Sequence, residues 1–231
     1  TVNNSAGGGN IGSADRIVRP LGAGEYASNL AVGVTDKNLL FDAGITTAFA
    51  DSVRPNSLTM EASAGLSLGS GVNLSLTSGG ILVRTGSDSV ISGGVLNQTS
   101  NLAPLNLWTI GTAQLTIASA MSGGNGLGSS AISTVKGGAG TLVIAPPTSQ
   151  VNGLAGVGSN SLSGQFVLNQ GTVKLGTGIK NALQAGNQFA LVGGFLDLNG
   201  NTQQLGALFS DQAYANANGT IKTTGGVAGL I

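Results

Sequence analysis

The chain has 231 residues, of which only 8% are charged, and its nine basic and nine acidic residues cancel. Apolar residues make up 41%, so the chain can bury a core and lacks the low hydrophobicity and high net charge of disordered chains. The balanced, scattered charge argues against a nucleic-acid partner, and no apolar run is long enough to predict a membrane span.

The N-terminal part of the sequence gives only weak structural signals. Residues 1–13 are rich in glycine and asparagine without periodicity, which predicts an irregular linker before a single domain over residues 14–231. A short helical turn is expected near residues 23–30. Strands are expected at Leu39–Phe41 and Ile45–Phe49 because these short runs are apolar.

A regular spacing begins at Leu58. Glycines separate short apolar runs, and aliphatic residues recur every eight positions, which predicts a strand and a turn in each interval. The spaced residues are Leu58, Leu66, Leu74, Leu82 and Val90. Strands are predicted at Leu58–Met60, Leu66–Leu68, Val72–Leu76, Ile81–Val83, Val90–Ile91, Val95–Leu96, Leu105–Ile110 and Leu115–Ile117.

This spacing favours an all-β solenoid, in which the chain winds into stacked coils. Three eight-residue sides would close a triangular coil of about 24 residues, within the range of solenoid repeats. Nine or ten coils stacked at about 4.8 Å would form a rod of about 45 Å. A β-sandwich is the alternative, but its turns are usually longer and more varied.

The C-terminal half continues the β pattern with less regular spacing. Residues 121–140 are rich in glycine and serine, after which Thr141–Ile144 resumes the strands. Proline cannot donate to a strand ladder, so Pro146 and Pro147 end that strand, and residues 145–164 are predicted to protrude as a loop. Further elements are strands at Phe166–Leu168, Thr172–Leu175, Gln188–Val192 and Phe195–Leu198, and a helical turn at Ile179–Ala185.

Glycine-containing motifs in this half resemble autotransporter-associated β-strand repeats. Lys136–Ile144 is similar to that family's K-x-G-x-G-T-L-x-L element. The order of the following motifs is also similar, through Ser163-Gly164, Asn169–Gly176, Gly194–Asn201 and Gln203–Leu208. Weaker likenesses lie upstream, at Arg19–Tyr26, Leu74–Leu82 and Ile91–Gly94.

The resemblance implies a right-handed parallel β-helix that bacteria export and display on, or shed from, the cell surface. From the residues themselves, neither end of the sequence shows a charged or helical cap that would cover an open sheet edge. We therefore expect head-to-tail self-association or continuation in a longer chain.

The residue inventory predicts no catalytic, cofactor or metal site. The chain has no cysteine and no histidine, which removes thiolate chemistry, the commonest general base and the commonest transition-metal ligand. Gly7–Gly12 fits a dinucleotide motif but lacks the preceding strand, and Gly123–Gly128 resembles a calcium-binding repeat but has glycine where the ligand aspartate would stand.

Several polar and aromatic residues remain candidates for other roles. Glu61 and Asp88 are 27 residues apart and could lie about one coil apart, as a glycosidase carboxylate pair would require. Trp108 could stack on a sugar, although packing in the core or at an edge is the preferred interpretation. Asp197 is expected to organise a turn with Asn199.

We therefore expect a non-enzymatic extracellular structural protein, which forms a surface fibre, a matrix or an adhesin stalk. A carbohydrate-active β-helix enzyme is the alternative from another class. A third possibility is a glycan-binding or cell-binding module that uses residues 145–164.

Overall fold

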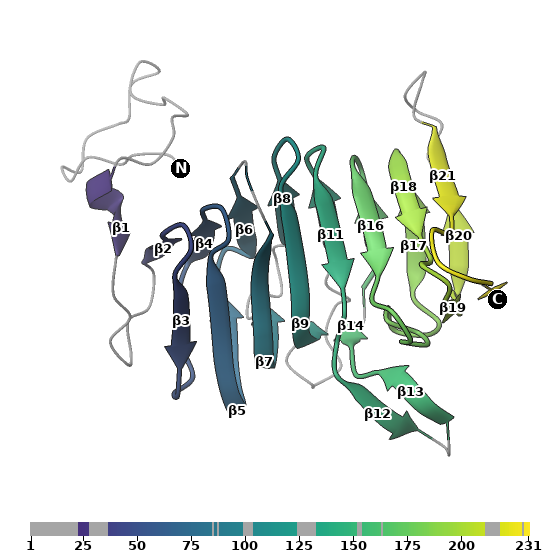
Figure 1. The fold of residues 1–231 in the computed structure, drawn as a ribbon, viewed down its shortest axis with the longest axis horizontal. Coiled ribbons are helices and arrows are strands. Elements are labelled where there is room, and N and C mark those ends of the chain that lie inside the picture. The colour runs from purple at the N-terminus through teal and green to yellow at the C-terminus, as the bar shows by residue number, and fades with distance from the viewer. Residues whose placement is uncertain are drawn as a thin grey trace, which may run out of the picture.

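The computed structural model describes residues 23–27, 37–84, 86, 88–98, 104–123, 133–151, 154–162, 164–210, 218–227 and 229–231. Short parallel strands wind around a common axis, and each coil stacks beside the one before it (Figure 1). The winding is right-handed, the sense that parallel crossovers almost always take (Figure 1). The predicted parallel β-helix is therefore confirmed, and the β-sandwich alternative is wrong.

The first face of the coil, called sheet 1, contains nine parallel strands. Eight steps of about 4.8 Å between them give a rod of about 38 Å, somewhat shorter than the sequence suggested. A short 3₁₀ turn at Ala23–Glu25 precedes its first strand. In spatial order the strands are β1 (Tyr26–Ala27), β2 (Asn38–Phe41), β4 (Ser57–Met60), β6 (Gly80–Val83), β8 (Leu105–Thr109), β10 (Thr134–Gly137), β15 (Phe166–Leu168), β17 (Gln188–Leu191) and β20 (Ala207–Phe209).

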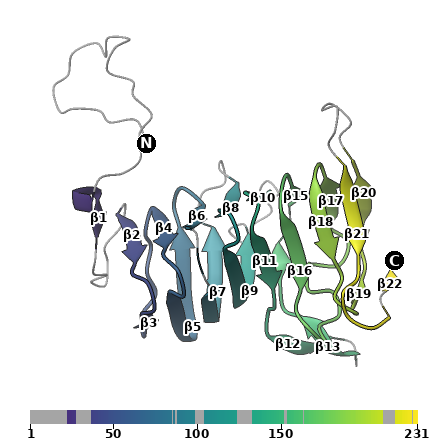
Figure 2. The same cartoon turned by 45° about the horizontal axis from the view of Figure 1, so that its top comes forward.

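The second face, called sheet 2, runs along the other side of the rod (Figure 2). Every pair of neighbouring strands in it is parallel. In spatial order its strands are β3 (Thr46–Phe49), β5 (Gly65–Leu76), β7 (Ser89–Gln98), β9 (Gln114–Gly123), β11 (Thr141–Ile144), β16 (Thr172–Leu175), β18 (Gly194–Asp197) and β21 (Gly219–Lys222).

The third face is made by the long strands of sheet 2 and by shorter pieces. The pairing of β5 with β7 shifts register between Leu68 and Asn73, and their C-terminal halves continue as a separate ladder. Val53 bridges to this ladder at Leu74, and β14 (Ser161–Leu162) pairs with the end of β9. Further along the rod, β19 (Thr202–Gln203) pairs with β22 (Gly229–Leu230). The coil is therefore three-sided.

Alternation along each strand separates an interior face from an exterior one. One interior column of sheet 1 runs through Leu39, Leu58, Ile81 and Leu107, and all four side chains are buried. Because each coil lies over the previous one, equivalent side chains stack directly on one another. The apolar core is consequently continuous along the rod.

The eight-residue spacing holds over only part of its predicted length. Leu58, Leu66 and Leu74 are buried as expected. The partner of Leu58 in the next coil is Ile81, so this coil has 23 residues rather than 24. Leu82 and Val90 therefore point outward, and Ile81 and Ile91 take the interior positions. The prediction that Leu82 and Val90 lie in the core was wrong, because the number of residues per coil is not constant.

Coil length varies because the corners differ in length. The step between register partners is 19 residues from Leu39 to Leu58 and 32 residues from Thr134 to Phe166. The longest coil contains the antiparallel hairpin of β12 (Thr148–Val151) and β13 (Leu154–Gly158). This hairpin occupies part of the segment predicted to protrude, and it projects from the body of the rod (Figure 1).

The corner between sheet 1 and sheet 2 contains a residue with positive φ in seven successive coils. Positive φ favours glycine because glycine has no Cβ. At Gly138 a Cβ would lie 2.2 Å from the carbonyl oxygen of Thr109, and at Gly171 it would lie 2.3 Å from that of Gly140. The seven residues are Gly44, Ser63, Gly86, Gly111, Gly138, Gly171 and Gly194.

Two segments differ from the expected secondary structure. The helical turn predicted at Ile179–Ala185 is wrong, because this stretch forms irregular turns. The strand β10 was not predicted, because the glycine and serine content of residues 121–140 concealed it. Near the N-terminus, the turn expected at residues 23–30 is limited to the short 3₁₀ turn among the described residues.

The neighbours Val90 and Ile91 test the observed register. Ile91 is fully buried, whereas Val90 is 37% exposed. We expect Ile91→Ala to lower the free energy of unfolding by about 3 kcal/mol, because it leaves a cavity in the core. Val90→Ala should change it by less than about 1 kcal/mol. Urea denaturation followed by circular dichroism measures both, and equal losses would contradict this register.

Candidate functional site

The most unusual interior position is Lys136. It occupies the sheet 1 column between Leu107 and Leu168, where other coils carry Leu or Ile. Its side chain is fully buried. A buried ammonium group is costly unless polar partners surround it, so its contacts show how the fold tolerates it.

Backbone carbonyl groups supply those partners. Lys136 Nζ donates to the carbonyl oxygens of Gly137 and Gly138 at 2.8 Å each, and to that of Gln170 in the next coil at 3.1 Å. These three bonds match the three donors of an ammonium group. They lie at the glycine-rich corner, where the positive φ of Gly138 and Gly171 turns the chain.

The same surroundings determine the proton affinity of this lysine. Burial lowers the pKa of Lys136 from 10.5 to about 8. The carbonyl acceptors favour the charged form and oppose this effect. An amine enclosed in this way binds two coils together. The arrangement therefore gives Lys136 a structural contact between two coils.

A second polar centre lies at Asp197 on the outer side of sheet 2. Its Oδ1 accepts hydrogen bonds from the backbone nitrogens of Asn199 at 2.9 Å and Thr224 at 3.0 Å. Its Oδ2 accepts one from Thr224 Oγ1 at 2.7 Å. The predicted turn with Asn199 is confirmed, and Asn199 adopts the left-handed conformation with φ of 49°.

Asp197 is largely buried, and burial alone would raise its pKa. The hydrogen bonds from Thr224 and Asn199, together with the positive charge of Lys174 in the preceding coil, outweigh that effect and lower the pKa of Asp197. Lys174 and Lys222 are its register partners on either side. The carboxylate therefore connects consecutive coils as an anion.

Buried amide side chains complete the third face where regular strands are short. Asn160 accepts from the Met121 amide nitrogen at 2.7 Å and donates to the Ala182 carbonyl at 2.6 Å. Asn201 accepts from the Ile179 nitrogen at 3.0 Å, and Gln203 accepts from the Leu183 nitrogen at 3.0 Å. These contacts explain why residues 179–185 are irregular, because side chains satisfy backbone groups that a helix would pair internally.

The two carboxylates considered for glycosidase chemistry, Glu61 and Asp88, have different surroundings. Glu61 forms an ion pair with Arg84 of the next coil at 2.6 Å, and Asp88 is an exposed residue. Among the described residues, no group of three or more acidic side chains gathers as a metal site would require.

Trp108 is the other candidate whose environment in the structure we can compare with the prediction. It lies on the outer face of β8 and is 48% exposed, so of the two packing environments expected for it, core or edge, the core is excluded. It reaches across to Gly137 of the next coil, which is its register partner. The predicted motifs Gly7–Gly12 and, for the most part, Gly123–Gly128 lie outside the described residues.

Comparisons with known proteins add no assignment. No protein-family model, curated protein or solved structure matches the chain. Within the part of the chain that the structure describes, no helix is long and apolar enough to cross a membrane. Any functional inference therefore depends on the chemistry of the chain itself.

Titration of Lys136 should be visible in the stability of the protein. Between pH 8 and 10.5 the unfolded chain holds a proton on this amine that the folded chain has released, so stability rises with pH. We expect the unfolding free energy of the wild type to rise relative to Lys136→Met by about 3 kcal/mol across this interval. Urea denaturation of both proteins at several pH values measures it. A constant difference would contradict the lowered pKa.

Asp197 should have its effect at the acidic end of the pH range. Its pKa is lower in the folded chain, so the stability it contributes is present above its ordinary value of 3.8 and is lost as the pH falls toward the folded value. At pH 7 we expect Asp197→Asn to cost about 2 kcal/mol because bonds to a charged acceptor are lost. The matched control is Asp88→Asn, at an exposed aspartate, which should have little effect. An equal loss in both variants would contradict this role of Asp197.

Proposed function

We propose that this chain is a structural segment of a bacterial surface fibre, matrix or adhesin stalk, and that it has no catalytic role. Its continuous apolar core and coil-to-coil ladders are suited to an extended rod. The interior Lys136 and the largely buried Asp197 are engaged in contacts between coils, which fits a structural role. The resemblance to autotransporter-associated repeats supports export and an extracellular location as part of this proposal.

The main support for this proposal is that side chains at core positions are exposed in the coil of β20, β21 and β22. Leu208 on β20 is the register partner of Phe189, which is fully buried, yet Leu208 itself is 44% exposed. Leu230 on β22 pairs with the buried Gln203 and is 41% exposed. Core positions therefore continue into this coil but remain uncovered there.

The opposite end of the rod differs. Leu39 and Phe41 of β2 are buried. The neighbouring strand β1 lies beyond them, and its Ala27 is the register partner of Leu39. A short strand thus covers part of this end. The asymmetry makes the coil of β20, β21 and β22 the growing end, onto which a coil of the same kind can stack.

We propose that a further coil of this type, from a second copy or from additional polypeptide, covers Leu208 and Leu230. Parallel pairing to the free edges of β20 to β22 would extend all three faces. Stacking would also bury the exposed apolar area, which favours association. This is how the chain would contribute to a filament or a stalk.

The neighbours Leu208 and Phe209 provide a matched test. Leu208 continues an interior column, whereas Phe209 is the register partner of Ala190 on the outer row. The apparent mass of the wild type, measured by light scattering, should rise above 22.5 kDa with concentration. Leu208→Asp should prevent this rise because a carboxylate would be buried at the junction. Phe209→Asp should behave as the wild type does.

Two results would contradict stacking at this end. One is a wild-type mass that stays at 22.5 kDa at the highest accessible concentration. The other is association of Leu208→Asp that is as strong as that of Phe209→Asp. Electron microscopy of the associated wild type should show rods longer than a single chain.

A further inference from the structure

The indole ring of Trp108 lies flat on the outside of the rod. A Cβ added to Gly137 would lie 2.9 Å from both Cε2 and Cζ2 of Trp108 and 3.0 Å from Cδ2. Nearly equal distances to three consecutive atoms of a six-membered ring place that point beneath the face of the ring and not at its edge. Gly137 therefore leaves room for the ring to lie parallel to the sheet.

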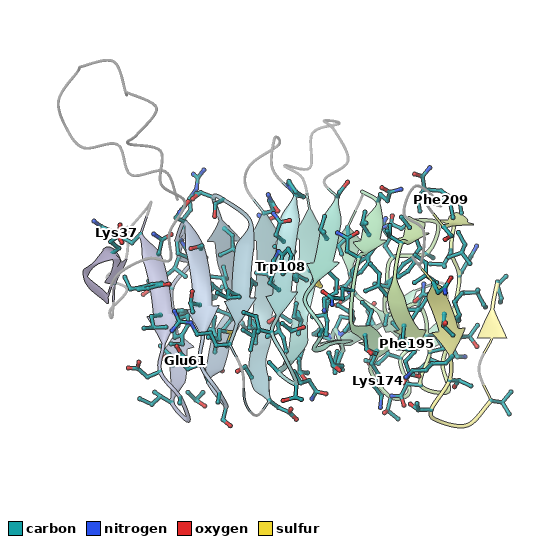
Figure 3. All side chains as sticks on the ribbon, turned by 90° about the horizontal axis from the view of Figure 1, so that it is seen from above. Lys37, Glu61, Trp108, Lys174, Phe195 and Phe209 are labelled. Atoms are coloured by element: carbon teal, nitrogen blue, oxygen red, sulfur yellow. The ribbon has the colours of Figure 1, made fainter. Side chains whose placement is uncertain are left out.

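The opposite face of the ring is open to solvent. The first face is covered by the Gly137 backbone, so the 48% exposure of Trp108 belongs mainly to the second face. Phe195, another exposed aromatic residue, has a different environment, because Lys222 Nζ lies 4.5 Å from its ring centroid. Figure 3 shows Trp108 midway along the rod and Phe195 nearer its C-terminal end.

Four described residues near the ring are neutral and of two kinds. Leu82 is its register partner in the preceding coil, and Ile110 and Asn106 lie two positions away on the same side of the chain. Asn169 is exposed and lies one coil beyond Gly137, since its backbone nitrogen donates to the Lys136 carbonyl. The exposed face of Trp108, called the platform, is therefore flanked by aliphatic side chains. One amide group lies in the same strand, and another lies two coils further along the rod.

The described charges around the platform are enclosed or paired. The Lys136 ammonium is buried and bonded to backbone carbonyl oxygens, and Arg84, which lies beside Ile110 in the preceding coil, is paired with Glu61 at 2.6 Å. A polyanion would need an excess of basic groups to replace its counterions, and this surface does not provide one. Two aliphatic side chains also form much less apolar surface than a stable protein interface requires.

We propose that Trp108 is a binding platform for a neutral polysaccharide, whose pyranose rings stack on the exposed face of the indole. A pyranose ring presents C–H groups on its face and hydroxyl groups at its rim. The flat indole suits the first, and the Asn106 and Asn169 amides can exchange hydrogen bonds with the second. This site is independent of the stacking end of the rod, which lies at β20 to β22.

The chain has one tryptophan, so its fluorescence reports on this platform alone. We expect cellohexaose, mannohexaose or chitohexaose, each added separately, to produce a saturable blue shift and to protect the indole from acrylamide quenching. By titration calorimetry, Trp108→Ala should weaken binding of the active hexasaccharide by at least about tenfold. Phe195→Ala, which removes an exposed aromatic ring from the other sheet, should leave binding unchanged.

Gly137→Val provides a second test that keeps the tryptophan. The added side chain would displace the ring from the sheet, so binding should weaken while circular dichroism confirms the fold. If this variant does not fold, Trp108→Ala still decides the matter. Light scattering of Trp108→Ala should match the wild type, because the rod proposal does not involve this residue.

Three results would overturn the platform. The first is the absence of a saturable change with all three hexasaccharides. The second is unchanged affinity in Trp108→Ala, which would place any binding elsewhere. The third is an equal blue shift caused by phosphatidylcholine vesicles, or by raising the protein concentration without sugar, which would show that a lipid surface or a second copy covers the ring.

Discussion

Parallel pairing of each coil with the previous one is the constraint on which the rest of this structure depends. In-register pairing places every interior side chain over its counterpart one coil away, so a column must have compatible chemistry along its whole length. Leu39, Leu58, Ile81 and Leu107 satisfy this requirement simply by being apolar. Lys136 satisfies it only because three carbonyl oxygens at the corner accept hydrogen bonds from its ammonium group.

The same constraint explains where the chain is free to vary. Residues added within a strand would shift every later side chain to the wrong face, whereas residues added at a corner leave the ladders unchanged. The hairpin of β12 and β13 is inserted in this way. At the corner between the two large sheets a residue has positive φ in seven successive coils, so glycine predominates there.

Interior and exterior positions therefore have separate roles. Interior polar groups such as Lys136 and Asn201 bond to the backbone and hold neighbouring coils together. Exterior side chains do not affect the ladders, which leaves the outer faces available for contacts with other molecules. In the functions proposed above, the coil end serves extension and the Trp108 platform serves recognition, and neither depends on the other.

The amino-acid sequence by itself determined the class of fold and most of the strands. Alternating aliphatic residues and regularly placed glycines are local signals, because each strand needs one apolar face and each tight corner needs a small residue. The same local chemistry predicted the turn at Asp197 and Asn199, which the structure confirms.

Only the tertiary structure decided the register and the environment of the individual candidates. A change of one residue in coil length moved Leu82 and Val90 outward and placed Ile81 and Ile91 in the core. The register between coils also pairs Glu61 with Arg84, and it places Trp108 beside Gly137 on the surface. These outcomes depend on which residues of different coils lie side by side. The lengths of all the corners together set this register along the whole chain. The strand signals are local, so they do not predict the register.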